Sequence, residues 1–205
     1  MKSNVLTRAQ CNTFRKRDIQ SNMVRFIKQC TGDLYQTPGP GHIRENWWIF
    51  QNILESYNNY IMVEYFVDIY QEMREEVKQI KRIQSKHSPN LQLKLGELFR
   101  TVRMANPNSV SFIDACFCVT VNKMIKDGLL VDIEKLCNTN VLTDVWYLSI
   151  TSSLRGCSKR ENNKGTEQIK KILRKNYKTV NEKYNTTYRD GNPMSTVLLK
   201  INNKI

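Results

Sequence analysis

A stretch of 43 residues, from Ile43 to Ser85, contains neither proline nor glycine and is the most apolar and aromatic part of the chain. This feature constrains the fold most, because proline and glycine are the residues that most often interrupt a helix. A helix of 3.6 residues per turn brings positions spaced by three and four onto one face. We therefore predict helix here, although the aromatic and β-branched residues of 60–70 would also suit a strand. The apolar stripe consists of Met62, Phe66, Ile69, Met73, Val77 and Ile80.

The other segments show a similar spacing of apolar residues, bounded by capping and turn residues. We predict a single compact domain of the all-α class with about seven helices. Stacking of these helices as irregular hairpins is one arrangement that they could adopt. The residues after Met194 form either a short edge strand or a tail. We divide the domain into a basic N-terminal helix (1–36), a central helical core (43–156) and a basic C-terminal helix with its tail (157–205). The predicted helices are 7–30, 43–85, 88–106, 109–127, 130–137, 143–155 and 166–185.

The charge of the chain is concentrated at its two ends. The net charge is +13, and residues 155–205 carry thirteen Lys and Arg against four acidic residues. Residues 1–30 carry seven against one, whereas residues 31–154 are close to neutral. Basic residues that gather in this way indicate a polyanionic partner, with nucleic acid first and an anionic membrane surface second.

The sequence offers little for catalysis or metal binding. His42 and His87 are the only histidines, and each lies beside a proline-containing break. The pair Cys116 and Cys118 lacks a second Cys or His pair at zinc-like spacing. The segment 37–42 (TPGPGH) lacks the spacing of a phosphate-binding loop, so we interpret it as a connector. We therefore expect no enzymatic activity, no catalytic residue, no cofactor and no metal.

Two functions fit these observations. The first is a non-enzymatic, backbone-directed nucleic-acid-binding protein, with RNA favoured, in a viral-type or organellar nucleoprotein assembly. The alternative is an interaction, scaffold or matrix-like protein whose basic helix meets an acidic partner or an anionic membrane surface. Protein partners and self-association stay open beside nucleic acid. Trp48 is the candidate for stacking on a base. The residues expected to contact nucleic acid are Arg15, Lys16, Arg17, Arg25, Lys28, Lys159, Arg160, Lys170, Lys171, Arg174, Lys175 and Lys178.

Cysteine content and hydropathy bear on the compartment. Six cysteines are too few for a disulfide scaffold in a chain of 205 residues, and neither a secretory signal nor a transmembrane segment is evident. We expect an intracellular protein of the cytoplasm, nucleus or mitochondrion. The first 30 residues are poor in acids and contain arginine, which is also typical of a mitochondrial presequence, and that alternative stays open.

Overall fold

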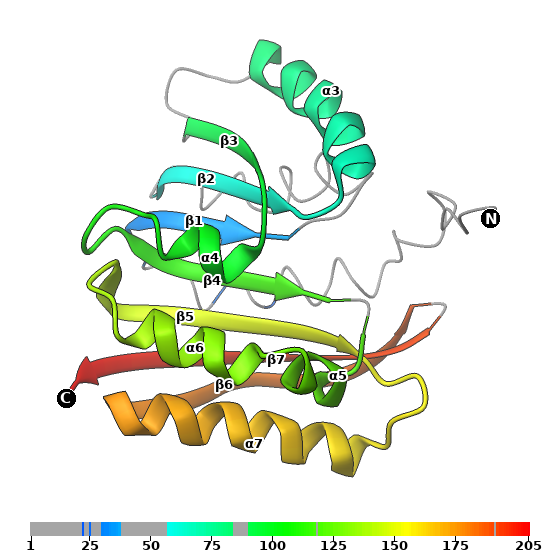
Figure 1. Cartoon of the computed structure of the whole chain (residues 1–205), viewed down its shortest axis with the longest axis vertical. Helices are drawn as coiled ribbons and strands as arrows, with labels where there is room; N and C mark the ends of the chain where they lie inside the picture. The colour runs from blue at the N-terminus through cyan, green and yellow to red at the C-terminus, as the bar shows by residue number, and fades with distance from the viewer. Residues whose placement is uncertain are drawn as a thin grey trace.

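The protein alternates strands and helices along its chain. The computed structural model describes residues 30–37, 57–83, 90–117, 119–190 and 192–205, together with Asn22 and Arg25. This is an α/β arrangement (Figure 1), so the prediction of an all-α domain is wrong. The elements are β1 (Gly32–Gln36), β2 (Tyr57–Glu64), α3 (Val67–Ile83), β3 (Asn90–Leu95), α4 (Leu98–Val102), β4 (Val110–Cys116), α5 (Val121–Lys126), α6 (Leu129–Cys137), β5 (Leu142–Ser153), α7 (Lys159–Asn176), β6 (Tyr177–Asp190) and β7 (Asn192–Lys204).

All seven strands belong to one mixed sheet in the order β3-β2-β1-β4-β5-β7-β6. The first five strands are parallel, and β7 is antiparallel to both of its neighbours, β5 and β6. The chain moves outward from β1 to β3, returns to the other side of β1 at β4 and continues to β5. The order of the strands therefore reverses between β1 and β4, which makes that position the switch point of a doubly wound sheet.

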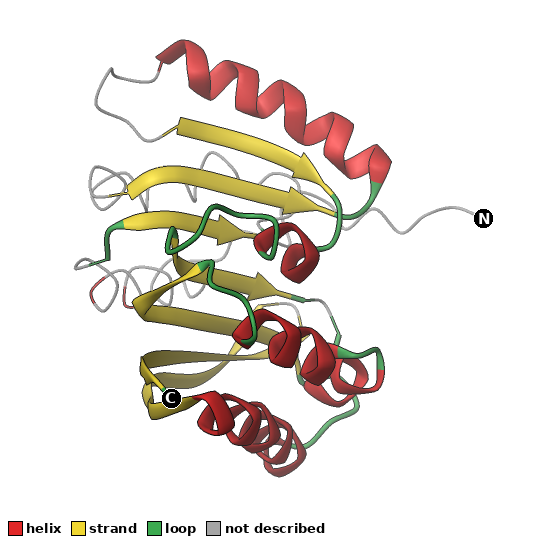
Figure 2. Ribbon diagram, turned by 60° about the vertical axis from the view of Figure 1, so that its left-hand side comes forward, coloured by secondary structure: helices red, strands yellow, loops and turns green. Residues whose placement is uncertain are grey.

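Helices cover both faces of the sheet. On one face α4, α5, α6 and α7 pack their apolar sides against the strands, and Figure 2 shows these helices on one side of the sheet. On the other face Met73, Val77 and Ile80 of α3 pack in a second core with Leu34, Tyr60 and other residues of the strands. Within the described part of the chain, no helix is long and apolar enough to cross a bilayer.

Most of the predicted helices contain a strand. In β4 the physical reason is burial on both faces: every residue from Val110 to Ala115 is buried, so the strand shows no alternation of apolar and polar residues. Its apolar positions also satisfy helical spacing. The helix predicted over 7–30 lies almost wholly outside the described residues. The corrected segments are 43–85 (β2 and α3 within its described part), 88–106 (β3 and α4), 109–127 (β4 and α5), 143–155 (β5) and 166–185 (the later part of α7, then β6).

The last two predictions for the C-terminal region also change. The last helix is predicted to begin at residue 166, but Ser158 caps α7 and the helix begins at Lys159. The side chain of Ser158 accepts a hydrogen bond from the Glu161 amide, while the Glu161 carboxylate accepts one from the Ser158 amide, which is a capping box. The residues after Met194 belong to β7, which lies inside the sheet rather than at its edge or in a tail.

A glycine allows α5 and α7 to approach closely. A Cβ atom on Gly165 would lie 2.5 Å from Cγ1 of Val121. Alanine is otherwise preferred to glycine in a helix by about 1 kcal/mol, so the two effects oppose each other. We expect Gly165→Ala to lower the free energy of unfolding by about 1–3 kcal/mol, as measured by urea denaturation, because overpacking exceeds the gain in helix propensity.

The background variant Val121→Ala provides the control for this prediction. It removes the methyl groups that the new Cβ would meet, so Gly165→Ala should then be neutral or stabilising. An equal loss of stability in both backgrounds would show that the contact between the two helices is not the cause.

Candidate functional site

The carboxyl ends of β1 and β4 meet at the switch point, where ligands bind in open α/β sheets. Gln36 ends β1, and its side-chain amide donates a hydrogen bond of 2.7 Å to Oδ2 of Asp114. The hydroxyl group of Tyr60 donates to the other end of the same amide, Oε1 of Gln36. Burial, together with the nearby charge of Asp114, raises the pKa of Tyr60 well above its usual value. The three buried side chains therefore form a fixed polar platform under this edge.

Thr37 joins the same two strand ends beyond the platform. Its amide donates to the Asp114 carbonyl at 3.1 Å, and its hydroxyl accepts a hydrogen bond of 2.8 Å from the Cys116 amide. The segment 37–42, interpreted above as a connector, therefore starts directly at the end of β1. In doubly wound folds that bind nucleotides, this position carries the glycine-rich turn. Residues 38–42 lie outside the described part of the chain.

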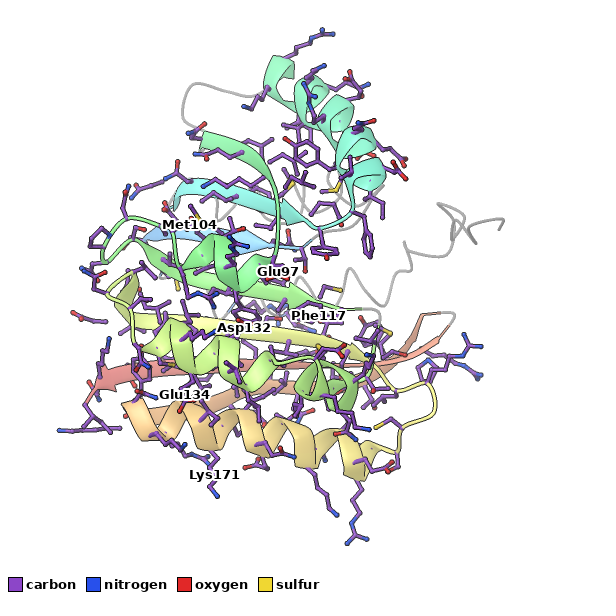
Figure 3. All side chains as sticks on the ribbon, in the orientation of Figure 1. Glu97, Met104, Phe117, Asp132, Glu134 and Lys171 are labelled. Carbon is purple, nitrogen blue, oxygen red and sulfur yellow. The ribbon has the colours of Figure 1, made fainter. Side chains whose placement is uncertain are left out.

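Two carboxylates follow the ends of the neighbouring strands β2 and β3. Glu64, half-buried, ends β2, and its Oε1 accepts a hydrogen bond of 2.9 Å from the Phe66 amide. The Gly96 amide, just after β3, donates to the Glu64 carbonyl at 2.9 Å and holds the two strand ends together. Glu97 comes next and its carboxylate is exposed at the start of α4, where Figure 3 labels it.

Large apolar side chains lie exposed beside these carboxylates. Tyr65 and Phe66, directly after Glu64, are 62% and 61% exposed, and their rings meet edge to face with centroids 5.3 Å apart. Leu95, at the end of β3, is 48% exposed. Carboxylates accept hydrogen bonds from hydroxyl and amino groups, and aromatic or aliphatic faces cover a flat ring. This edge therefore has the groups needed to bind a nucleoside.

Sequence reasoning missed these residues because it placed them on helices. A signal was present: the short apolar run Y-I-M-V at 60–63 is followed by Glu64. The signal at Glu97 is weaker, because the preceding L-K-L-G at 93–96 contains a lysine. An acidic residue after a buried strand is the feature by which doubly wound folds hold a ribose.

The predicted nucleic-acid contacts fall into three groups. Lys159, Arg160, Lys171, Arg174, Lys175 and Lys178 are exposed on α7 and at the start of β6, and Arg25 is also exposed. Lys170 is buried instead. The roles of all these residues in binding stay predictions. Outside the described residues lie Arg15, Lys16, Arg17, Lys28 and Trp48.

Lys170 faces the protein interior between two carboxylates. Its Nζ lies 2.7 Å from Oε1 of Glu167 and 2.5 Å from Oε2 of Glu182. Burial alone would lower the pKa of Lys170, but its hydrogen bonds to the two glutamates outweigh burial and raise it. The side chain thereby links α7 to β6. Removal of either glutamate would leave the buried Lys170 charge with one partner fewer and would destabilise the protein.

Comparisons with known proteins bear on the fold. No protein-family model matches the chain, and no curated protein matches it in sequence. Among solved structures it resembles a putative methyltransferase, yhhF from Escherichia coli, with a TM-score of 0.56 and 10% identity over 93% of this chain and 87% of that one. The N-methyltransferase NodS from Bradyrhizobium japonicum gives a TM-score of 0.57 and 9% identity over 91% and 96%. TYW2 from M. jannaschii, solved in complex with AdoMet, gives 0.55 and 14% over 92% and 75%.

These likenesses overturn two expectations from the sequence. Two of these solved proteins are described as methyltransferases, and the third was solved with AdoMet, the methyl donor S-adenosylmethionine. They contradict the expectation that the protein has no enzymatic activity. The non-enzymatic nucleic-acid-binding component and the scaffold or matrix-like protein are therefore both corrected. At identities of 9–14% the likeness concerns the fold itself. The chain thus has a Rossmann-like α/β fold that resembles the fold of these solved methyltransferases.

Proposed function

We propose that the protein is a methyltransferase that binds S-adenosylmethionine at the carboxyl edge of its sheet. The observation that carries this proposal is the position of Glu64, a half-buried carboxylate at the end of β2 beside the switch point. The residues present fit the nucleoside part of the cofactor, because carboxylates and exposed rings lie together there. Glu64 would accept hydrogen bonds from the ribose hydroxyls, Glu97 from the adenine amino group, and Tyr65, Phe66 and Leu95 would cover the base.

When bound, S-adenosylmethionine supplies an electrophilic methyl group carried on a sulfonium. The chain's own contribution is to bind and orient. The hydrogen bonds among Tyr60, Gln36 and Asp114 hold the ends of β1 and β4 in one arrangement, so groups placed above them need little reorganisation. Thr37 adds a second link between the same ends. A rigid edge of this kind suits a reaction that depends on alignment of two bound molecules.

For the substrate, we propose a nucleic acid, with RNA before DNA. The net charge of +13 supports a polyanion, and the excess of thirteen basic over four acidic residues in 155–205 lies in the part of the chain that builds α7, β6 and β7. The expectation of a nucleic-acid partner is thus kept in a different role, as the molecule that is methylated.

Thermal unfolding with S-adenosylhomocysteine, the product form of the cofactor, tests the proposed function. A ligand at about 100 times its dissociation constant stabilises the native state by about 2.7 kcal/mol. For a chain of this size we expect Tm to rise by about 5–10 °C. NAD provides the control, because it is the usual ligand of the other large group of doubly wound folds. No shift with S-adenosylhomocysteine, or an equal shift with NAD, would contradict the proposal.

A further inference from the structure

The cations of α7 fall into two groups. Lys170 lies between two glutamates, Arg174 lies 3.7 Å from Glu167, and Lys175 lies 3.7 Å from Glu134. Four others are exposed, and no acidic group of the described residues lies within ion-pair distance of them. They are Lys159, Arg160, Lys164 and Lys171.

Three of these unpaired cations share one face of the helix. Arg160, Lys164 and Lys171 follow one another at steps of four and seven residues, so they form a stripe about 16 Å long. A shallow groove runs along it, lined by these cations with Lys159 and the polar side chains of Asn163 and Gln168, and with Glu167. Figure 3 shows Lys171 pointing away from the sheet.

The stripe continues toward the carboxyl edge. Arg155 lies exposed in the turn between β5 and α7, and Arg189 lies exposed near the end of β6. The two regions adjoin, because the Leu154 amide donates a hydrogen bond of 2.7 Å to the carbonyl of Pro193, which is paired with Arg189 across the hairpin. We call the set of six cations the basic track. It consists of Arg155, Lys159, Arg160, Lys164, Lys171 and Arg189.

A role in holding the helix together does not explain these side chains. Lys159 and Arg160 lie in the first turn of α7, where the helix dipole disfavours positive charge. The helix is already fixed by its capping box and by a buried side that includes Ile169 and Leu173. Among the described residues, Glu161 and Glu167 lie near the stripe but form no ion pair with its cations. The track therefore has an excess of positive charge on the surface, which favours an anionic partner.

We propose that the basic track binds the phosphate backbone of a single-stranded nucleic acid and leads it toward the carboxyl edge of the sheet. This inference rests on the proposed function for what happens at that edge. A protein partner fits less well, because the groove lining contains no aromatic or aliphatic side chain of the kind that anchors protein interfaces. A flexible chain of phosphates needs only spaced cations and polar donors, and these are what the track offers.

Binding of a fluorescein-labelled oligouridylate of about 20 nucleotides to the full chain tests the track by fluorescence anisotropy across a salt series. Six phosphate contacts on a single strand predict a slope of log affinity against log salt of about −4. The triple variant Arg160→Glu, Lys164→Glu, Lys171→Glu should reduce the slope to about −2 and weaken binding at least tenfold at about 50 mM salt.

The matched control reverses three exposed cations on the distant helix α3: Arg74→Glu, Lys81→Glu, Arg82→Glu. It changes the net charge equally, so affinity should fall by no more than about twofold to threefold if position matters. An equal loss in both variants would overturn the track, since overall charge alone would then explain binding. Unchanged RNA binding in the track variant would overturn it as well.

Binding of S-adenosylhomocysteine, measured by calorimetry on the same samples, separates this inference from the proposed function. Loss of RNA binding with cofactor binding intact supports the track and shows that the variant is folded. RNA binding through the track without any cofactor binding would refute the proposed function alone. If the track variant instead loses binding to vesicles with anionic lipid, while the unaltered chain does not bind RNA, the track is a membrane surface and the inference is wrong.

Discussion

Glu64→Gln will weaken binding of S-adenosylhomocysteine by about 10- to 100-fold, because a hydrogen bond to a charged group contributes about 1.5–3 kcal/mol. The substitution keeps the size of the side chain and one acceptor oxygen. The hydrogen bond that Glu64 accepts from the Phe66 amide therefore persists, and the end of β2 keeps its shape. Isothermal titration calorimetry measures the change in affinity directly.

Glu75→Gln is the matched control for that experiment. Glu75 is an exposed carboxylate on α3 whose partner is Lys78, and it lies away from the strand ends. Its replacement should leave the affinity unchanged within about twofold, which is less than 0.5 kcal/mol. If Glu64→Gln binds as tightly as the unaltered protein, the nucleoside does not lie at the end of β2 and the proposed cofactor site is wrong.

The largest effect on stability should come from Gly32, at the start of β1. Its φ angle is +125°, and a Cβ atom there would lie 2.4 Å from the carbonyl oxygen of Ser109. That oxygen also accepts a hydrogen bond from the Asp33 amide, so backbone on both sides would have to move. We expect Gly32→Ala to lower the free energy of unfolding by about 3–5 kcal/mol, the sum of backbone strain and overpacking.

Gly128→Ala separates the two contributions. Gly128 has a similar φ of +105°, but apart from its own chain neighbours nothing lies within 4 Å of the position that its Cβ would occupy. It should therefore lose only the strain of a positive φ, about 1–2 kcal/mol. Urea denaturation of both variants gives the comparison. Equal losses would mean that the close approach of Ser109 to β1 contributes nothing.

Part of the fold could be predicted from helical spacing. The helix expected over 130–137 is confirmed as α6, Leu129–Cys137. In α3 the spacing also identified the buried side, since Met73, Val77 and Ile80 are all in the core. These helices are amphipathic, and an apolar stripe at helical spacing over several turns indicates a helix.

The strands could not be predicted in the same way. β4 and β5 lie inside the sheet and are buried along most of their length, so apolar residues follow one another without alternation. Val110, Ile113 and Phe117 satisfy helical spacing, although Val110 and Ile113 belong to a strand and Phe117 follows it. Short apolar runs of this kind are ambiguous by period alone. Only for residues 60–70 do the aromatic and β-branched residues also indicate a strand, and there β2 is found.

The candidate site could not be predicted from the sequence for the same reason. Its residues come from positions 36, 64, 97 and 114, which only the parallel order of the strands brings to one edge. If these segments were helices, nothing in the sequence would bring the glutamates at positions 64 and 97 to the same edge. The basic residues of α7 were visible in the sequence, but which of them are paired depends on Glu134 and Glu182 from other elements.

The position of β7 has a consequence for synthesis on the ribosome. β6 emerges before β7, yet β7 is the strand that separates it from β5. A nascent chain that stops short of residue 192 therefore leaves the edge of β5 open, with β6 able to attach to it in the wrong place. We expect the hairpin of β6 and β7 to form first and then join β5 as a unit, so that β6 never pairs with β5 directly.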